Sequence, residues 1–279
     1  MTYFEFLTRF VGIPLLILLL LTWRDQRLRR RLPLRLRSWP VRAVILAHIV
    51  LAVLYTTPWD NYLVATGVWW YDPNLVTGLV LGWVPVEEYT FFVLQTLAMG
   101  LLLVFLAKRL PLPPQPITPL PAHARLRAVV AAVTAAVWLA ALLLLLSAWA
   151  PGVYLALILV WALPPVVLQM ALGVDILWRY RTLIFWTLAP ATLYLGIADS
   201  LAIGAGTWVI DPAQSTGILL GGLPLEEGVF FLLTNVLVVF GMVLVLAAET
   251  QQRVPAALIE FLRRFAGRST QQQEGLSHV

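Results

Sequence analysis

Two pairs of adjacent glutamates, Glu87-Glu88 and Glu226-Glu227, lie within long apolar segments of this sequence. An acid inside a membrane-spanning helix is costly to place and is a candidate functional group. Because desolvation and a neighbouring like charge both favour the protonated form of a carboxyl group, a crowded pair can supply a general acid and a general base together. Adjacent helical residues point about 100° apart, so we expect one of each pair to face the site. All four are candidate catalytic residues; a contact between helices that only fixes packing is the alternative.

The two acidic pairs belong to a duplicated unit. Residues 78–88 recur as 217–227, shifted by 139 residues without a gap. From Asp60 to Leu94 the sequence matches its shifted copy at 15 of 35 positions. Coincidence among apolar residues does not produce shared Trp, Pro, Asp and Glu, so the chain contains two copies of one structural unit.

Proline and glycine recur beside both pairs. Pro85 and Pro224 each precede a glutamate pair by two positions. Proline removes a helix hydrogen bond, which predicts a kink and a free carbonyl that a protonated carboxyl could engage. Glycines spaced by four permit close helix approach, a packing role that we assign to Gly78, Gly82, Gly217 and Gly221. We therefore expect the third and seventh spans to cross near the acids.

Aromatic residues flank both pairs at equivalent positions. Ring faces can stabilise a cation without offering it a nucleophile. For the tryptophans, which fall in predicted outer loops, an interfacial aromatic belt is the alternative. The aromatic candidates for substrate contact are Phe91, Phe92, Phe230, Phe231, Trp69 and Trp208.

Four aspartates stand at the outer ends of predicted spans. Asp72 and Asp211 precede prolines, which is typical of turns with a capping aspartate. Asp60 and Asp199 end their spans and could hydrogen-bond toward the glutamates, so both are candidate substrate-binding residues. His48 in the second span has Thr187 as its counterpart, which argues against a shared catalytic role.

The composition predicts an all-α polytopic membrane protein. The 279 residues are 61% hydrophobic and only 12% charged, against about 25% charged in soluble domains. Apolar runs near the ~20 residues that cross a bilayer recur along the chain. They predict seven transmembrane helices at 3–22, 41–57, 77–106, 127–149, 152–171, 182–198 and 214–247.

Each copy contributes three spans, one to three and five to seven. An odd number of spans would invert the second copy, but the fourth span, as a linker helix, restores its direction. The two three-helix repeats are thus expected to be parallel, about a twofold axis along the membrane normal. Both acidic pairs then lie at one depth, roughly 15 Å from the outer side at ~1.5 Å per residue.

Basic residues set the expected orientation, because they favour the cytoplasmic side. With seven crossings, 18 of the 19 fall on one side, which places the N-terminus outside and the C-terminus inside the cytoplasmic membrane. The first apolar run lacks a basic leader and is expected to be a retained span, not a cleaved signal. Contact with anionic lipids and the setting of membrane orientation explain the basic runs better than nucleic-acid binding does.

The expected organisation has four parts: a first repeat (1–110), a proline-rich loop with the linker span (111–150), a second repeat (151–249) and a cytoplasmic tail (250–279). Within them we expect an extended connector over 110–125, an amphipathic helix over 253–268 and disorder over 269–279.

Residues and motifs that the sequence lacks argue against several classes of function. The chain has no cysteine and no GxGxxG after a strand, and no Asp-rich cluster supports magnesium-dependent prenyl transfer. The sole lysine, Lys108, lies at a helix end, which argues against a retinal Schiff base. We expect neither a metal nor a cofactor.

The motifs Pro85-Val86-Glu87-Glu88 and Pro224-Leu225-Glu226-Glu227 resemble those of the heterodimer-type carotenoid cyclases, whose two homologous halves each carry Pro-x-Glu-(Glu/Asp). Fused halves also form the cyclase domain of fungal bifunctional lycopene cyclase/phytoene synthases. The flanking segments 58–60, 67–69 and 91–92 look similar, so the resemblance covers about residues 1–248.

The resemblance implies a redox-neutral cyclisation of lycopene ψ-ends to β-ionone rings, giving γ-carotene and β-carotene, without a flavin. It implies a lipid-soluble carotenoid substrate and a pseudo-heterodimer within one chain. The hypothesis is one composite site between the third and seventh spans. The alternatives are a cyclase of a C50 or otherwise modified carotenoid end, a proton-coupled transporter, and a carotenoid-binding protein without catalysis.

Overall fold

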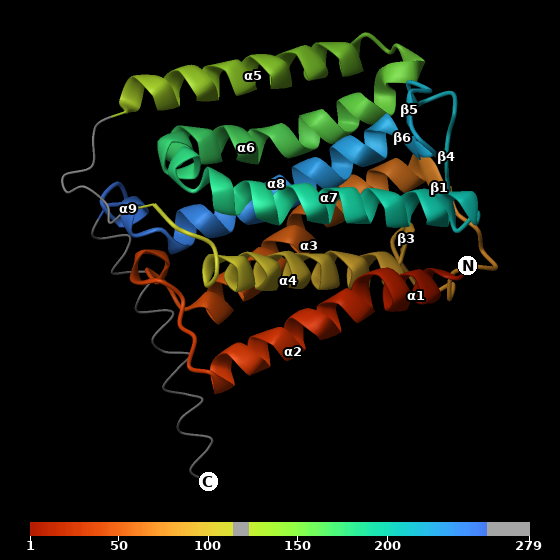
Figure 1. Ribbon diagram of the computed structural model, residues 1–279. Coiled ribbons are helices and arrows are strands. Elements are labelled where there is room, and N and C mark those ends of the chain that lie inside the picture. The colour runs from red at the N-terminus through yellow and green to blue at the C-terminus, as the bar shows by residue number, and fades with distance from the viewer. Residues whose placement is uncertain (114–122, 256–279) are drawn as a thin grey trace.

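The computed structural model describes residues 1–113 and 123–255, which form a bundle of long helices lying side by side (Figure 1). The predicted connector over 110–125 and tail helix over 253–268 fall largely outside the described residues, and 269–279 lie wholly outside them. The helices are α1 (Tyr3–Phe6), α2 (Ile13–Arg27), α3 (Val41–Ala65), α4 (Val86–Ala107), α5 (Ala124–Leu146), α6 (Val153–Arg179), α7 (Arg181–Gly204), α8 (Leu225–Leu246) and α9 (Ala248–Gln251). A π-helical stretch, Leu7–Gly12, joins α1 to α2.

Within the described ranges, seven helical segments are long and apolar enough to cross a membrane. The prediction of an all-α protein with seven spans is confirmed. The second and sixth spans are longer than predicted, because α3 continues through Pro58 to Ala65 and α7 continues to Gly204. Membrane helices tolerate proline where neighbours satisfy the freed backbone groups. Asp60 and Asp199 therefore lie inside helices and not at their ends.

The third and seventh spans begin later than predicted. Residues before α4 form a short hairpin of β2 (Val80–Leu81) and β3 (Val84–Pro85), and residues before α8 form one of β5 (Leu219–Leu220) and β6 (Leu223–Pro224). Their apolar character suggested helix, but the large side chains of both hairpins are mostly exposed, as expected for a surface that faces lipid.

The expected kinks and the expected glycine packing are both wrong. Pro85 and Pro224 are the N-cap residues of α4 and α8, where proline interrupts no helix hydrogen bond. The four glycines have φ between 68° and 77°, a backbone conformation that glycine adopts without strain. They shape the hairpins and lie in no helix; they are Gly78, Gly82, Gly217 and Gly221.

Each hairpin folds back along the bundle. The backbone N–H of Trp83 donates to Oδ1 of Asn61 in α3 at 2.7 Å, and the Tyr89 hydroxyl donates to the carbonyl of Leu81 at 2.8 Å. In the second hairpin, Leu223 packs against Gly196 of α7. The hairpins thus fix the ends of α4 and α8 that carry the acids.

The two copies meet in a third pair of strands, β1 (Trp69–Tyr71) and β4 (Trp208–Ile210), at the N-terminal end of the bundle (Figure 1). The strands are antiparallel, and Trp70 lies opposite Val209, its counterpart in the second copy. The flanking hydrogen bonds recur under the same shift: the N–H of Asp72 donates to Thr207, and that of Asp211 to Val68.

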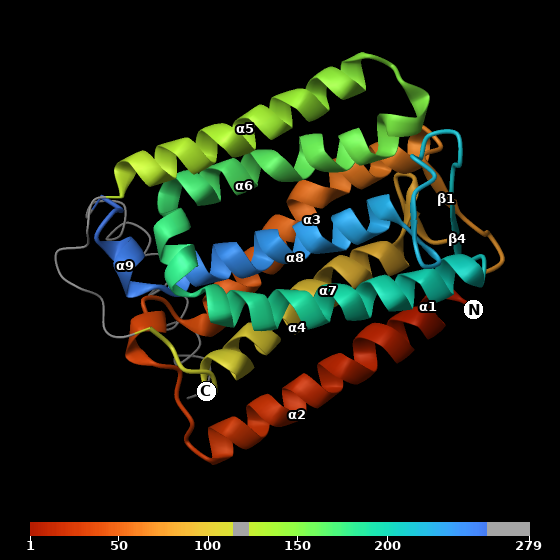
Figure 2. The same cartoon turned by 45° about the horizontal axis from the view of Figure 1, so that its top comes forward.

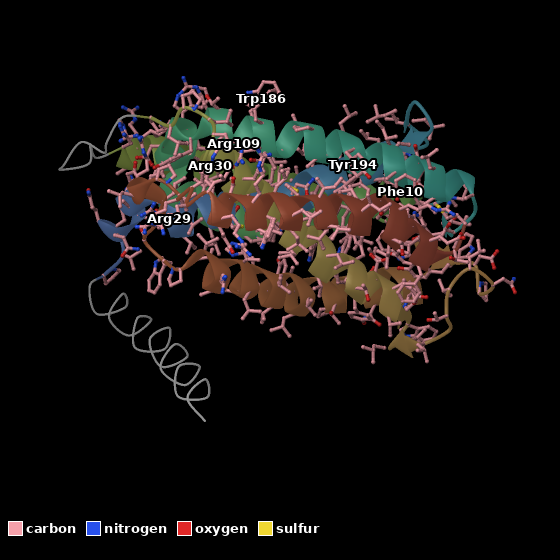
Figure 3. All side chains as sticks on the ribbon, turned by 60° about the horizontal axis from the view of Figure 1, so that its bottom comes forward. Phe10, Arg29, Arg30, Arg109, Trp186 and Tyr194 are labelled. Carbon is pink, nitrogen blue, oxygen red and sulfur yellow. The ribbon has the colours of Figure 1, made fainter. Side chains whose placement is uncertain are left out.

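Helices α4 and α8 lie at the centre of the bundle, where they contact each other and α3 and α7, whereas α5 packs against α6 at the edge (Figure 2). The end of the bundle opposite Phe10 carries Arg29, Arg30 and Arg109 (Figure 3). At that end, Arg109 and Lys108 form ion pairs with the buried Asp25.

Candidate active site

Glu88 and Glu227 lie in the first turns of α4 and α8 and face one small cavity of about 30 Å³. Asp199 of α7 contributes a third carboxyl group. All other lining residues in the described chain are aromatic: Tyr3, Phe6, Trp69, Tyr71, Phe91, Trp208, Phe230 and Phe231. The cavity therefore combines carboxyl groups that can transfer a proton with aromatic ring faces.

The other member of each pair points away from this cavity. Glu87 accepts a hydrogen bond from the backbone N–H of Thr77 at 2.6 Å, and Glu226 accepts equivalent bonds from the N–H and hydroxyl of Thr216 at 2.7 and 2.8 Å. Both glutamates are fully buried. They connect the start of each helix to the segment that enters its hairpin.

Three tyrosines donate to the cavity glutamates. The hydroxyl groups of Tyr3 and Tyr71 both donate to Oε2 of Glu88, the second at 3.1 Å. The hydroxyl of Tyr154 donates to Oε1 of Glu227 at 2.5 Å. Burial and the charge of Glu88 raise the pKa of Tyr71, in the loop between spans, well above its usual range. Tyr71 thus remains a hydrogen-bond donor at physiological pH.

The sequence reasoning missed Tyr3 and Tyr154, which occupy matching places in the first span of each copy. The N–H of Tyr3 donates to Leu75 and that of Tyr154 to Gln214, two residues related by the shift of 139. The tyrosines themselves are 151 residues apart. The same spacing separates Pro14 from Pro165, a faint signal that an ungapped comparison does not detect.

Asp60 and Asp199 are buried within electrostatic range of both cavity glutamates. The expected hydrogen bonds to the glutamates do not form. Oδ1 of Asp199 accepts from Nε1 of Trp208 at 3.1 Å, whereas both oxygens of Asp60 lack a hydrogen-bond partner among the described residues. Asp72 and Asp211 accept backbone hydrogen bonds two residues on, which confirms their predicted turns.

The aromatic candidates divide between two places. Trp69 and Trp208 are 7% and 9% exposed and line the cavity, so they do not belong to an interfacial belt. Phe91 and Phe231 meet there with ring centroids 6.3 Å apart. Phe92 instead lines a larger neighbouring groove, and Phe230 lines both spaces.

The fold and this cavity define an integral membrane protein of the polytopic helical class, with an acidic site enclosed by aromatic rings. The chain belongs to the lycopene cyclase family, which matches residues 3–107 and 152–245. Both matched segments contain one glutamate pair, and α5 lies between them.

Proteins with similar sequences are named as lycopene cyclases. A lycopene beta-cyclase of Halobacterium salinarum is 41% identical over 196 residues, which cover 70% of this chain and 79% of that protein. A bifunctional lycopene cyclase/phytoene synthase of Podospora anserina is 38% identical over 205 residues, covering 70% of this chain and 33% of that protein. A bifunctional lycopene cyclase/phytoene synthase of Phaeosphaeria nodorum is 37% identical over 209 residues, which cover 71% of this chain and 34% of that protein. No solved structure matches the chain.

Proposed function

We propose that this protein is a lycopene β-cyclase, which converts lycopene ψ-ends to β-ionone rings by acid–base chemistry without net oxidation or reduction. The observation that carries the proposal is the cavity in which Glu88, Glu227 and Asp199 meet only aromatic rings. The relative at 41% identity, named a lycopene beta-cyclase, supports the same reaction.

The reaction is an isomerisation in which one proton enters and one leaves. A protonated carboxyl group donates its proton to C2 of the ψ-end, which leaves a cation at C1. The C5–C6 double bond attacks C1, closes the ring and moves the cation to C5. A carboxylate then removes the proton from C6, which forms the C5–C6 double bond of the β ring. The aromatic walls stabilise both cations without trapping them.

The acid and the base are assigned to the two cavity glutamates. Hydrogen bonds donated to a carboxylate stabilise its ionised form. Glu88 receives two tyrosine hydroxyls and Glu227 receives one. Glu88 is therefore proposed as the base and Glu227 as the acid. Asp60 and Asp199 place two further carboxyl groups beside both, and because like charges disfavour ionisation, the cluster retains protons.

Glu87 and Glu226 are proposed as positioning residues, because their hydrogen bonds hold the hairpins and not the cavity. The flanking glycines and prolines have the same task, since they shape those hairpins. Trp69, Trp208, Phe91, Phe230 and Phe231 are proposed to contact the reacting end of the substrate.

The two copies are proposed to act as a pseudo-heterodimer, with repeats at 1–110 and 151–249 and the linker span between them. The pairing of β1 with β4 and the recurrent hydrogen bonds support this division. The arginine-rich end is proposed to face the cytoplasm, which places the N-terminus and the acidic cavity toward the outer side of the cytoplasmic membrane.

The test is expression of this chain alone in cells that accumulate lycopene, followed by chromatography of the carotenoids. We expect monocyclic and bicyclic products from the wild type and from Glu5→Gln, a control at an exposed glutamate, and none from Glu88→Gln/Glu227→Gln. Unchanged lycopene in wild-type cells that contain the protein, or full conversion by the double variant, would contradict the proposal. Feeding a C50 or hydroxylated acyclic carotenoid to the same cells tests the alternative substrates.

A further inference from the structure

A second space lies beside the acidic cavity and is much larger. It is a groove of about 430 Å³ between α3, α4, α6 and α8. Along α8 it extends from Phe230 to Val245, about 22 Å at ~1.5 Å per residue. That length is a large part of the ~30 Å thickness of a bilayer's hydrocarbon core. The groove can therefore hold an extended chain that lies along the bundle.

The groove and the cavity share one wall. The ring of Phe230 lines both spaces. It belongs to an aromatic stack in which Trp59 lies 4.5 Å from Trp161 and 5.7 Å from Phe230, measured between ring centroids. A cavity of about 30 Å³ has room for a water molecule, but not for a ring of six carbons beside the glutamates. The end of a substrate can reach the acids from the groove if Phe230 turns aside.

The chemistry of the lining fits a hydrocarbon. Within the described chain, the groove has no Asp, Glu, Lys or Arg in its lining. A phospholipid headgroup would find no charged partner there. Its polar side chains are largely satisfied internally: Gln95 bonds to Asn235, and Gln169 to the carbonyl of Leu237. Aromatic rings of Tyr55, Trp161 and Phe230 lie at the end near the cavity.

We propose that this groove binds the polyene chain of the substrate, with one end in the acidic cavity beyond Phe230 and the other near Leu244 and Val245. The inference rests on the proposed function and names where its substrate lies. Since only one end of the groove meets the acids, the two ends of the substrate react in separate binding events. In the second event, the ring already formed lies at the Val245 end.

The experiment uses two groove-filling variants of the full chain, each with a control on the same helix that faces away from the groove. Val245→Trp narrows the end of the groove far from the cavity, and Leu232→Trp is its control. Ala52→Trp fills the middle of the groove, and Leu54→Trp is its control. All are expressed in lycopene-accumulating cells, and products are normalised to the protein present in membranes. A ring is bulkier than an open end, so Val245→Trp should raise the ratio of monocyclic to bicyclic product about tenfold. Ala52→Trp should lower both products about tenfold or more.

Val245→Phe provides a smaller change should the tryptophan variant not reach the membrane, with a rise in the same ratio expected. Wild-type yields and ratios in Val245→Trp and Ala52→Trp would overturn the groove assignment while the cyclase activity stands.

Retention of lycopene by purified protein separates the two proposals. If the wild type forms no ring, the proposed function fails, and the groove is tested by lycopene absorbance per mole of protein. We expect Ala52→Trp to retain about tenfold less lycopene than Leu54→Trp. Equal retention would overturn the groove assignment independently of activity.

Discussion

The two halves of the acidic cavity are built from the same duplicated unit, yet their hydrogen bonds differ. On one side, Glu88 receives two tyrosine hydroxyls and Asp60 has no partner in the described chain. On the other, Glu227 receives one hydroxyl and Asp199 accepts from Trp208. Trp69, the counterpart of Trp208, leaves its indole N–H unpaired among the described residues. Two glutamates at equivalent positions of the sequence repeat thus face one cavity with unequal sets of hydrogen-bond donors.

Replacing each cavity glutamate separately tests most directly whether the two sides of the cavity have different roles. Glu88→Gln and Glu227→Gln should each lower turnover on the order of 100-fold or more, the usual contribution of a general acid or base. Their residual products should differ. Without the base, the C5 cation can lose other protons, so Glu88→Gln should give ε or γ rings beside β rings, whereas Glu227→Gln should give β rings only.

The measurement is chromatography and mass spectrometry of products formed in D2O, where the donated deuteron appears at C2. Identical ring mixtures from the two variants would show that the halves are interchangeable.

Removing the tyrosine hydroxyls should have a smaller and unequal effect. Tyr154→Phe leaves Glu227 without a side-chain donor, whereas Tyr3→Phe leaves Glu88 with Tyr71. A hydrogen bond to a charged group is worth roughly 1.5–3 kcal/mol, so Tyr154→Phe should slow turnover about tenfold or more and Tyr3→Phe less. Initial rates in membranes test the order, with Tyr62→Phe, an exposed tyrosine, as the control. The reverse order would contradict the proposed inequality.

The buried glutamates outside the cavity should affect stability more than chemistry. Glu226 accepts two hydrogen bonds and Glu87 accepts one. Glu226→Ala should therefore destabilise the protein more than Glu87→Ala, by about 1–2 kcal/mol for the additional unsatisfied donor. Thermal unfolding of the purified variants in detergent measures the difference. A loss of turnover equal to that of Glu88→Gln, in a variant of wild-type stability, would instead place these residues in the chemistry.

The smallest expected effect concerns alkaline pH. The pKa of Tyr71 is raised in the folded protein, so its neutral form contributes stability that is complete below the unfolded pKa of about 10. That stability is lost as pH rises through the folded pKa. Wild-type protein should thus lose stability more steeply above pH ~10 than Tyr71→Phe. Parallel stability curves over pH 9–12 would count against the buried hydroxyl on Glu88.

Much of the site follows from the sequence, because its charged residues stand out in apolar segments. The repeat identified both glutamate pairs, their flanking rings and two of the aspartates, and apolar length identified seven spans. The wrong predictions for the hairpin segments have one cause. Hydropathy indicates whether a segment contacts lipid, but not whether its backbone is helical. Residues 78–85 and 217–224 are as apolar as helix, but their glycines have positive φ and form hairpins.

The same limit explains the missed tyrosines. Tyr3 and Tyr154 are single polar residues in apolar runs, and only the packing of the first span of each copy against α4 or α8 brings them to Glu88 and Glu227. The inequality between the two glutamates arises from three-dimensional contacts such as these, which a comparison of the copies cannot reveal.

The pairing of β1 with β4 has a consequence for the association of the halves. Each strand alone has an unpaired edge of three residues, and an unpaired edge can pair with another copy of itself. Two identical halves joined in this way would place like glutamates opposite each other, with two acids or two bases at the centre. Covalent linkage makes the pairing of the unlike strands an intramolecular event and so raises their effective concentration. A single chain thereby favours the pairing of β1 with β4, which under the proposed assignment brings one proton donor to one acceptor.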